Sequence, residues 1–247
     1  MELQFECDGG LGSNAALGLI VLQADETIEK EFRPLFDLDG VVLYHARIQS
    51  DPEVNEETLL RMKASLTDTA ALLPGNRPLD VIGYACTSAS TVIGSDAVEA
   101  AIRNAHPNAR VTNPAVAVVA ALRHLRVKKV GVVTPYITEV SDAVVELLRE
   151  EGLDPVKVGS FGQSEEATVA RIAPGSVEKA VQVIGEDPGV EAVFASCTNL
   201  RTFPVIDVCE RNLGKPVISS NLALAWHMMT LAGIQTTGLG PGKLFES

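Results

Sequence analysis

Two apolar runs of this chain each end in a cysteine, and small polar residues follow. The first run is residues 79–85, ahead of Cys86, and the second is residues 190–196, ahead of Cys197. Each run has the length and the β-branched content of a buried strand. Each cysteine is therefore expected at the carboxyl end of a strand, where open α/β sheets place their ligand sites.

The spacing between the two cysteines recurs elsewhere in the chain. Three pairs of residues lie about 110 positions apart: Gly18 and Gly131, Cys86 and Cys197, and Asn113 and Asn221. Three landmarks at one spacing indicate two copies of a strand–helix unit. Chance periodicity in an ordinary α/β chain is the alternative interpretation.

Alternating strand and helix patterns predict the fold class. We expect an α/β protein with two similar lobes, each a parallel sheet flanked by helices, related by pseudo-two-fold symmetry. The predicted segments are an irregular lead-in, a first lobe, a second lobe, and a C-terminal helix that packs back on the first lobe, followed by a tail: 1–16, 17–113, 114–220 and 221–247. In this arrangement Cys86 and Cys197 face each other across a cleft between the lobes.

The charge and hydropathy of the chain exclude several classes of partner. A net charge of −12 argues against nucleic acid and anionic membrane surfaces, because both require basic patches. No apolar run reaches the roughly 18 residues of a membrane span, and the N-terminus lacks the pattern of a signal peptide. We therefore expect a cytoplasmic protein with free thiols. The apolar segment 221–232 suits either the core or a subunit interface, and we expect a homo-oligomer, either a dimer or a tetramer.

Metal and cofactor motifs are missing from the sequence. The four histidines have no metal-ligand spacing, and no H-E-x-x-H motif occurs. The glycines of the tail, Gly238, Gly240 and Gly242, do not lie between a strand and a helix, so they do not form a dinucleotide fingerprint. We expect neither a metal nor a cofactor.

The pair Cys86 and Cys197 suggests acid/base chemistry. A helix that starts after each cysteine would lower the pKa of its thiol. The backbone N–H groups that would then hold a carboxylate belong to Thr87, Ser88, Thr198 and Asn199. One thiolate removes a proton from the substrate carbon, or attacks it, and the other thiol delivers a proton to the opposite face. Buried cysteines often only pack, and this is our interpretation of Cys209; for Cys7 we also assign no role.

Three motifs resemble those of the aspartate/glutamate racemase superfamily: Ala85-Cys86-Thr87-Ser88, Val133-Thr134-Pro135-Tyr136 and Ser196-Cys197-Thr198-Asn199. The resemblance is closest to its maleate isomerase and arylmalonate decarboxylase branch and covers about residues 17–232. It implies a two-lobed α/β fold and a cofactor-independent reaction on a small carboxylate bound between the lobes.

The resemblance also implies roles for individual residues. Cys86 becomes the first-lobe cysteine that attacks or takes the proton, Cys197 the second-lobe acid/base, and Tyr136 a substrate contact. Arylmalonate decarboxylases have glycine where this chain has Cys86. The resemblance therefore favours isomerisation or racemisation over decarboxylation by Cys197 alone.

Two acidic positions depart from the maleate isomerase pattern. Where maleate isomerases have asparagines that contact the substrate's carboxylates, this chain has Asp25 and Glu166, with Glu165 as the neighbouring candidate. Two carboxylates would repel a dicarboxylate and suit a substrate that carries an ammonium group. The alternative is that each acid only stabilises the start of a helix.

These observations predict a racemase-like enzyme acting on an amino-bearing carboxylate. The ectoine-utilisation racemase-like proteins, which are linked to diaminobutyrate derivatives, are the nearest resemblance within the superfamily. A maleate cis-trans isomerase, an arylmalonate-type decarboxylase and a non-enzymatic two-lobe binding protein are the alternatives.

Overall fold

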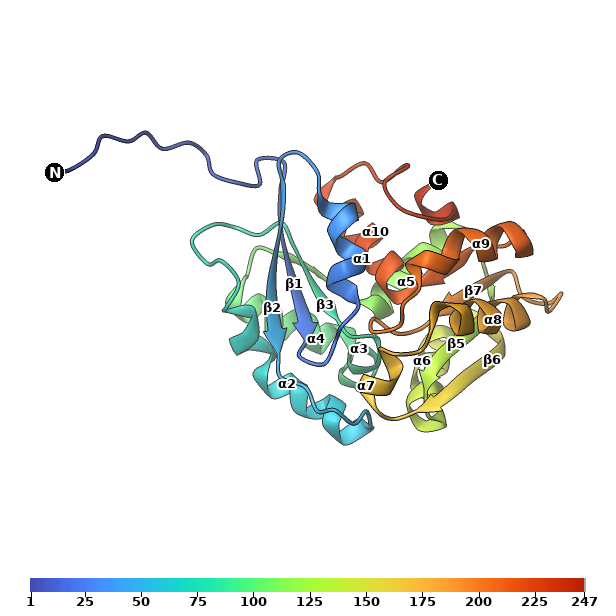
Figure 1. Cartoon of the computed structure of the whole chain (residues 1–247). Coiled ribbons are helices and arrows are strands. Elements are labelled where there is room, and N and C mark those ends of the chain that lie inside the picture. Colours follow the sequence, from blue (N-terminus) through green and yellow to red (C-terminus); the bar gives the residue numbers. More distant parts are fainter. Residues whose placement is uncertain (247) are drawn as a thin grey trace.

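Two α/β lobes lie side by side in the computed structural model of this protein, which describes residues 1–246 (Figure 1). Within these residues the strands form two four-stranded sheets, and all neighbouring strands are parallel. The strand order is β2-β1-β3-β4 in the first sheet and β6-β5-β7-β8 in the second. The second order repeats the first, strand for strand, so the predicted fold class is confirmed.

The first half of the chain supplies the first sheet. Its strands are β1 (Ala15–Leu22), β2 (Val41–Ile48), β3 (Val81–Ala85) and β4 (Arg110–Thr112). Its helices are α1 (Ile28–Phe36), α2 (Glu56–Ala70), α3 (Thr87–Ile93), α4 (Ser95–Ala105) and α5 (Pro114–His124). β1 starts slightly before the expected residue 17.

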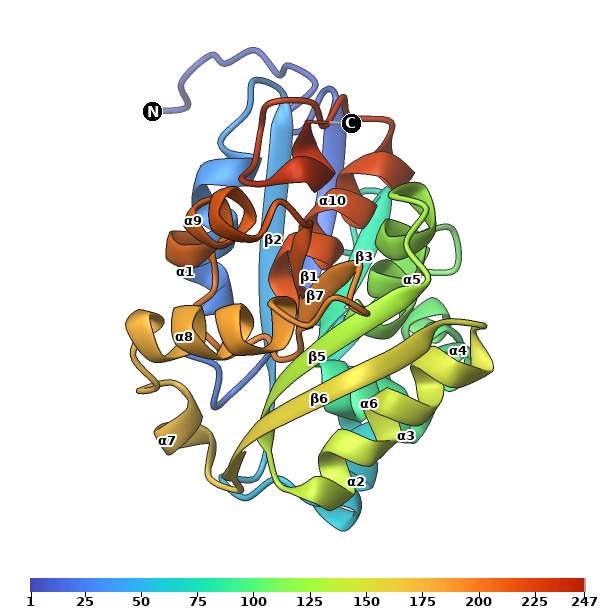
Figure 2. The same cartoon turned by 90° about the vertical axis from the view of Figure 1, so that its right-hand side faces the viewer.

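The second half supplies the second sheet, which Figure 2 shows in front of the first. Its strands are β5 (Lys129–Tyr136), β6 (Asp154–Gln163), β7 (Ala192–Ala195) and β8 (Val217–Ser219). Its helices are α6 (Thr138–Glu150), α7 (Glu166–Val169), α8 (Pro174–Gly185), α9 (Phe203–Leu213) and α10 (Ser220–Ala232), followed by the 3-10 helix η1 (Lys243–Phe245).

The central strands are buried because helices cover both faces of each sheet. All eight residues of β1 are buried, as expected for a run of Ala, Leu, Ile and Val in a parallel sheet. The repeated glycines allow this close packing. A Cβ atom at Gly18 would overlap Leu73, and one at Gly131 would overlap Ile184. The two lobes thus use a glycine in the same way at equivalent positions of β1 and β5.

Two long helices join the lobes. α5 ends the first half and α10 ends the second, and they pack against each other. α10 also contacts β3 and β4 of the first sheet and β8 of the second. Met228 and Met229 are fully buried and Trp226 nearly so, so the apolar character of this helix is explained by the core. The homo-oligomer stays a prediction.

The two ends of the chain differ. The first residues run outward as an extended segment (Figure 1), whereas the tail beyond α10 folds back, with Leu244 and Phe245 buried. The tail, expected to be irregular, contains one short helix, η1. In residues 1–246 no helix combines the length and the apolarity that a bilayer span requires.

Candidate active site

The residues singled out from the sequence line one cavity between the lobes. The lining comprises Leu22, Asp25, Cys86, Thr87, Ser88, Tyr136, Glu166, Cys197, Thr198 and Asn199. They follow or end five strands: β1, β3, β5, β6 and β7. Parallel strands bring their carboxyl ends to one edge of a sheet, and here the two edges face each other. Only Leu22 was missed, because an apolar residue at the end of a strand carries no chemical signal.

Cys86 lies at the start of helix α3, as expected. It is the N-cap residue, and its Sγ accepts a hydrogen bond from the Ala89 N–H at 3.3 Å. The expected lowering of its pKa is wrong. Burial raises the pKa of the Cys86 thiol to about 12, and the nearby charge of Glu166 adds to the effect, against the opposing Ala89 hydrogen bond. Desolvation of the thiolate outweighs one helix terminus because both lobes enclose the sulfur.

Cys197 precedes a turn, and here the expected helix start is wrong. The next helix, α9, begins only at Phe203. The Sγ atom of Cys197 lies 3.2 Å from Tyr136 Oη and accepts a hydrogen bond from the Asn199 N–H at 3.2 Å. Burial raises the pKa of Cys197 well above its ordinary value, and the charge of Glu166 adds to this rise. Both thiols are therefore protonated at neutral pH in this closed cavity.

Asp25 has one oxygen engaged and one free. Its Oδ1 accepts hydrogen bonds from the N–H groups of Thr27 (2.8 Å) and Ile28 (2.9 Å) at the start of α1. Its Oδ2 is buried and has no partner at hydrogen-bond distance among residues 1–246, although the nearby Thr198 hydroxyl helps to lower the pKa of the carboxyl group. Burial raises the pKa of this carboxyl group against the opposing backbone hydrogen bonds. Asp25 therefore does stabilise the start of α1, but only through Oδ1; this role does not explain the position of Oδ2.

Glu166, rather than the exposed Glu165, reaches the cavity. Its Oε1 accepts a hydrogen bond from Tyr136 Oη at 2.7 Å, and its Oε2 accepts one from Asn199 Nδ2 at 2.8 Å. Burial raises the pKa of Glu166 against both hydrogen bonds. Tyr136 therefore contacts Cys197 and Glu166 with one hydroxyl, and burial raises the pKa of that phenol well above its ordinary value.

The hydroxyl residues and Asn199 hold the walls of the cavity. Thr87 Oγ1 donates to Ser220 Oγ at 2.7 Å, across the lobe boundary. Asn199 Oδ1 accepts the Glu26 N–H at 2.9 Å, also across the boundary. The N–H of Thr198 makes no hydrogen bond within the part of the chain that the structure describes. It is available to an oxygen of a bound carboxylate.

The cavity is acidic and closed. It contains two carboxyl groups, two thiols and a phenol, and no lysine, arginine or histidine contributes to its lining. Its volume is about 10 Å³, enough for one water molecule at most. A substrate can enter only after the lobes or the loops that join them move apart.

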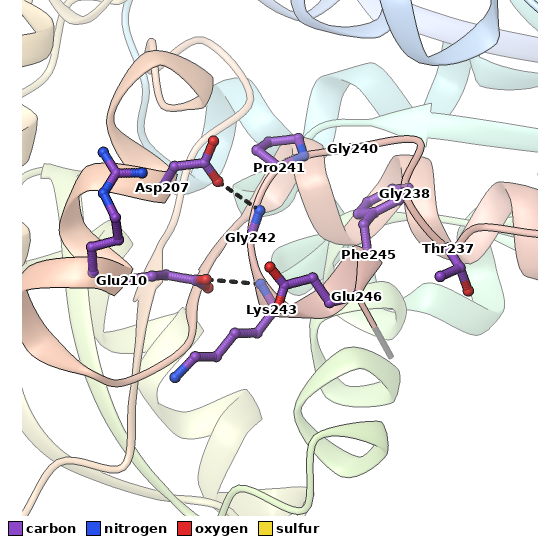
Figure 3. A pocket seen from close by; sticks show the side chains of 11 residues that line it. Asp207, Glu210, Thr237, Gly238, Gly240, Pro241, Gly242, Lys243, Phe245 and Glu246 are labelled. Carbon is purple, nitrogen blue, oxygen red and sulfur yellow. Dashed lines mark hydrogen bonds between the residues drawn. The ribbon is translucent and has the colours of Figure 1, made fainter.

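A larger cavity of about 680 Å³ lies beneath the C-terminal tail (Figure 3). Its acidic side chains are used to hold the tail. Asp207 Oδ1 accepts the Gly242 N–H at 2.9 Å, and Glu210 Oε2 accepts the Lys243 N–H at 2.8 Å. Neither Cys86 nor Cys197 lines this larger cavity. We therefore assign this cavity to the docking of the tail and the smaller one to the chemistry.

No group of three or more His, Cys, Asp or Glu side chains within residues 1–246 is arranged to hold a metal ion. Among the four cysteines, Cys209 is buried on α9, outside the cavity, and Cys7 is exposed near the N-terminus. Neither adds to the candidate site.

Comparisons with known proteins agree with this arrangement. The arylmalonate decarboxylase family model matches residues 17–245. The maleate isomerase of Pseudomonas putida is 24% identical, over 93% of this chain and 96% of that protein. The arylmalonate decarboxylase of Bordetella bronchiseptica is 34% identical, over 55% of this chain and 57% of that protein.

A solved structure extends the match to the fold. The maleate cis-trans isomerase of Nocardia farcinica, 25% identical, superposes with a TM-score of 0.85, and the match covers 94% of this chain and 97% of that one. The sequence match and the fold match both run through nearly the whole chain. This chain is therefore an enzyme of the arylmalonate decarboxylase family, in the branch of the aspartate/glutamate racemase superfamily that also contains the maleate isomerases.

Proposed function

We propose that this enzyme is a cofactor-independent racemase or isomerase of a small carboxylate that bears an amino group. Cys86 and Cys197 act as its acid/base pair, or as nucleophile and acid. The observation that carries the substrate class is the free Oδ2 of Asp25, a buried acceptor on the cavity wall with no hydrogen-bond partner among residues 1–246. An ammonium N–H would satisfy this oxygen with a charge-assisted hydrogen bond.

The electrostatics of the cavity support the same substrate class. Asp25 and Glu166 both have raised pKa values, with burial as the largest cause. The charge of Arg47 opposes the rise at Asp25 from outside the cavity, and among residues 1–246 no basic side chain lines the cavity itself. A bound ammonium group places a positive charge inside the cavity and lowers the pKa of both carboxyl groups. It also lowers the pKa of the two thiols, because a nearby cation favours every anionic form. The substrate would thus help to generate the thiolate that attacks it.

The remaining lining residues bind the carboxylate of the substrate. The free Thr198 N–H and the N–H groups of Thr87 and Ser88 at the start of α3 are the donors. Asn199 keeps Glu166 in place and shapes the Cys197 side of the cavity. The carboxylate and the ammonium group then meet opposite walls, which orients the α-carbon between the two sulfur atoms.

The reaction is a proton exchange at that carbon. One cysteine, as thiolate, takes the α-proton, and the electron pair moves into the bound carboxylate. The other cysteine, as thiol, gives its proton to the opposite face of the same carbon. The C–H bond that breaks is replaced by one of inverted configuration, and the two sulfurs exchange roles for the reverse reaction. No electron acceptor is needed.

A dicarboxylate substrate is the second candidate. The curated relatives include maleate isomerases. The raised pKa values of Asp25 and Glu166 favour their neutral forms, and a protonated carboxyl group could donate a hydrogen bond to a substrate carboxylate. In this case Cys86 or Cys197 attacks the double bond, and activity rises as the pH falls. With an ammonium substrate, activity falls as the pH falls, because the acids must be ionised.

Two further alternatives differ in how they use the cysteines. A decarboxylase that uses Cys197 alone would tolerate Cys86→Ala with full activity. A non-enzymatic binding protein would bind a small acid tightly in calorimetry, leave it chemically unchanged, and lose nothing on Cys→Ser substitution.

The deciding experiment offers three substrates to the purified enzyme: N-acetyl-diaminobutyrate, aspartate and maleate. Chiral chromatography follows the two amino compounds, and fumarate formation follows maleate. We expect racemisation of an amino compound, and we expect Asp25→Asn to lower kcat/KM for it by about 10- to 100-fold, the value of one charged hydrogen bond. Turnover of maleate, with no effect on either amino compound and a gain in Asp25→Asn, would contradict the proposal.

A further inference from the structure

A buried glutamate lies behind the cavity and takes no part in its lining. Glu31 is on α1 in the first lobe and is 7% exposed. The hydrogen-bond partners of its carboxylate all belong to the second half of the chain: Thr202, Phe203 and Asn221. A charged group buried this deeply is costly unless several donors satisfy it. Its position therefore calls for a structural or functional reason.

One oxygen of Glu31 caps helix α9. Its Oε1 accepts hydrogen bonds from the N–H groups of Thr202 (2.8 Å) and Phe203 (2.9 Å). The N-cap residue of α9, Thr202, makes no side-chain capping bond of its own. The carboxylate of Glu31 thus replaces the usual N-cap side chain, from the other lobe. This contact holds the far end of the segment that begins at Cys197.

The other oxygen of Glu31 acts on the near end of the same segment, through Asn221. Glu31 Oε2 accepts a hydrogen bond from Asn221 Nδ2 at 2.7 Å, and the same nitrogen donates to the carbonyl oxygen of Thr198 at 2.8 Å. Thr198 directly follows Cys197. Both neighbours of this nitrogen are acceptors, so the amide must turn its NH2 group toward them.

The orientation of Asn221 carries a cost. Its Oδ1 is buried without a hydrogen-bond partner among residues 1–246. Asn221 keeps this orientation although its Oδ1 is unsatisfied, because the Glu31 carboxylate and the Thr198 carbonyl both require a donor. The Asn221 bond therefore requires an ionised Oε2, since a protonated oxygen would present a donor in place of an acceptor.

We propose that Glu31 is a positioning residue that holds the segment 197–202 at both ends and thereby directs the thiol of Cys197. The inference rests on the proposed catalytic role of Cys197. Glu31 does not line the cavity, so it acts only through Asn221, Thr202 and the backbone of that segment. Cys86 is outside this network: its Sγ is held by Ala89 of its own helix.

The charge state of Glu31 controls this hold. The groups that contact its carboxylate are all uncharged, and Glu31 forms no ion pair within the described residues. The charged or titratable side chains on the elements packed around it are Glu29, Lys30 and Arg33 on α1, Tyr44, His45 and Arg47 on β2, Cys197 and Arg201 in the segment, Asp207, Cys209, Glu210 and Arg211 on α9, and His227 on α10. Burial raises the pKa of Glu31 to about 7. The Asn221 link to Thr198 is accordingly in place above about pH 7 and weakened below it.

The chain offers a matched control in Glu210. It is also 7% exposed, and its carboxylate also accepts two backbone N–H groups, those of Val217 and Lys243. Burial raises its pKa as well. Glu210 holds the C-terminal tail and lines the larger cavity, not the one with the cysteines. Replacing it by Gln removes a buried charge without touching the Cys197 segment.

The test is the rate of alkylation of Cys197 by iodoacetamide, with Cys86 in the same protein as the internal reference. Peptide mass spectrometry reports both rates at pH 6 and pH 8. At pH 8 we expect Glu31→Gln to accelerate the reaction of Cys197 about 10-fold or more relative to Cys86, the effect of losing hydrogen bonds to a charged group. At pH 6 the difference from wild type should largely vanish, because Glu31 is then protonated in the wild type too.

Two further variants separate positioning from folding. Asn221→Ala keeps the α9 cap and cuts the link to Thr198, so it should accelerate Cys197 at pH 8 and, like Glu31→Gln, have little effect at pH 6. Glu210→Gln should leave the Cys197 to Cys86 ratio at the wild-type value. Should the variants fail to fold, the wild type alone still decides: its Cys197 to Cys86 rate ratio must rise as the pH falls through about 7.

A ratio that is independent of pH in the wild type, or equal acceleration of Cys86 and Cys197 in Glu31→Gln, would overturn the proposal. The alkylation assay requires no turnover. If the enzyme proved to work without Cys197, the proposed function would fail while the alkylation result stood, so the two failures are distinguishable.

Discussion

The two cysteines occupy equivalent positions in the two lobes but are held in different ways. Cys86 follows β3 and caps a regular helix, and the hydrogen bond to its sulfur comes from Ala89, within its own lobe. Cys197 follows β7 and precedes a turn, and the Glu26 N–H and Thr27 hydroxyl of the first lobe bind Asn199 in that turn. The first thiol thus lies on a regular helix, whereas the second lies in an irregular segment that contacts with the other lobe help to hold.

This difference shows what duplication of a strand–helix unit does and does not copy. The copied feature is the strand end, because a parallel sheet places it at the same edge in both lobes. The surroundings diverge. Within residues 1–246, Cys197 has a phenol of its own lobe within hydrogen-bond distance, Tyr136 Oη at 3.2 Å, whereas the hydrogen bond to Cys86 Sγ comes from the Ala89 N–H. We therefore expect the two thiols to serve opposite faces of a substrate with unequal acid strength.

Removing either thiol should have the largest effect. Cys86→Ala and Cys197→Ala should each lower racemisation by about 1,000-fold or more, because each removes a general acid/base. In deuterium oxide, each variant should still exchange the α-proton of one enantiomer only, and the two variants should prefer opposite enantiomers. Nuclear magnetic resonance of the substrate measures this exchange.

The exposed Cys7 provides the control for that experiment, and Cys7→Ala should behave as wild type. Exchange of the same enantiomer by both cysteine variants would mean that the two thiols act on one face. The different environments of the two thiols would then have no bearing on the mechanism.

The pH dependence of stability should come next in size. The pKa of Glu31 rises from 4.5 to about 7 on folding, so the folded state binds this proton more tightly than the unfolded state does. Its contribution to stability is fully present below pH 4.5 and is lost as the pH rises through about 7. Relative to Glu31→Gln, which cannot titrate, the wild type should lose about 3 kcal/mol of unfolding free energy over this range.

Urea unfolding of both proteins at pH 4.5 and pH 8 measures this change. Glu57→Gln, at a glutamate whose side chain is 84% exposed, should track the wild type at both pH values. A constant difference between wild type and Glu31→Gln across the range would show that no titrating group anchors the Cys197 segment, and the contrast with Cys86 would weaken.

Removing the hydroxyl of Tyr136 should have a smaller effect than either the cysteine substitutions or the titration of Glu31. Tyr136→Phe removes hydrogen bonds to Cys197 (3.2 Å) and Glu166 (2.7 Å) and leaves Cys86 with its own partner. We expect about a 10-fold loss in kcat/KM, the value of one such hydrogen bond. Because the two enantiomers have equal free energy, kcat/KM should fall equally in both directions of racemisation. Exchange of the α-proton in deuterium oxide should fall most for the enantiomer that Cys197 deprotonates, and nuclear magnetic resonance of each enantiomer measures this exchange.

Tyr84 is the matched control for this variant, since its buried hydroxyl donates to Met62 Sδ at 3.8 Å, has no hydrogen bond to Cys86 or Cys197 within the described residues, and does not line the cavity. Tyr84→Phe should therefore keep full activity. Equal losses of α-proton exchange for both enantiomers in Tyr136→Phe would indicate that Tyr136 acts on the substrate and not through Cys197.

Much of the candidate site could be predicted from local patterns. Cys86, Tyr136 and Cys197 each end or follow an apolar run that must be a buried strand, and parallel strands gather their carboxyl ends. Which of the two glutamates, Glu165 or Glu166, reaches the cavity could not be predicted so simply. The two are adjacent, and the start of α7 exposes the first and buries the second.

Other errors came from effects that no local pattern contains. The segment after Cys197 was expected to start a helix, but Asn199 is bound by Glu26 and Thr27 of the other lobe, and α9 starts later. Glu31 was not recognised, because its partners are far along the chain. Asn221 was noted only as a landmark of the repeat, and its link from Glu31 to Thr198 appeared only in the folded protein.

The sequence by itself determined the duplicated parallel α/β architecture and the position of two thiols at equivalent strand ends. Both follow from the period of apolar residues and from the geometry of parallel sheets, which are local and repetitive. The tertiary structure alone decided the protonation of those thiols and the anchoring of Cys197. The sequence suggested lowered pKa values, whereas burial raises the pKa of Cys86 to about 12. The physical reason is that desolvation depends on which atoms of the opposite lobe surround a group, and only folding brings them there.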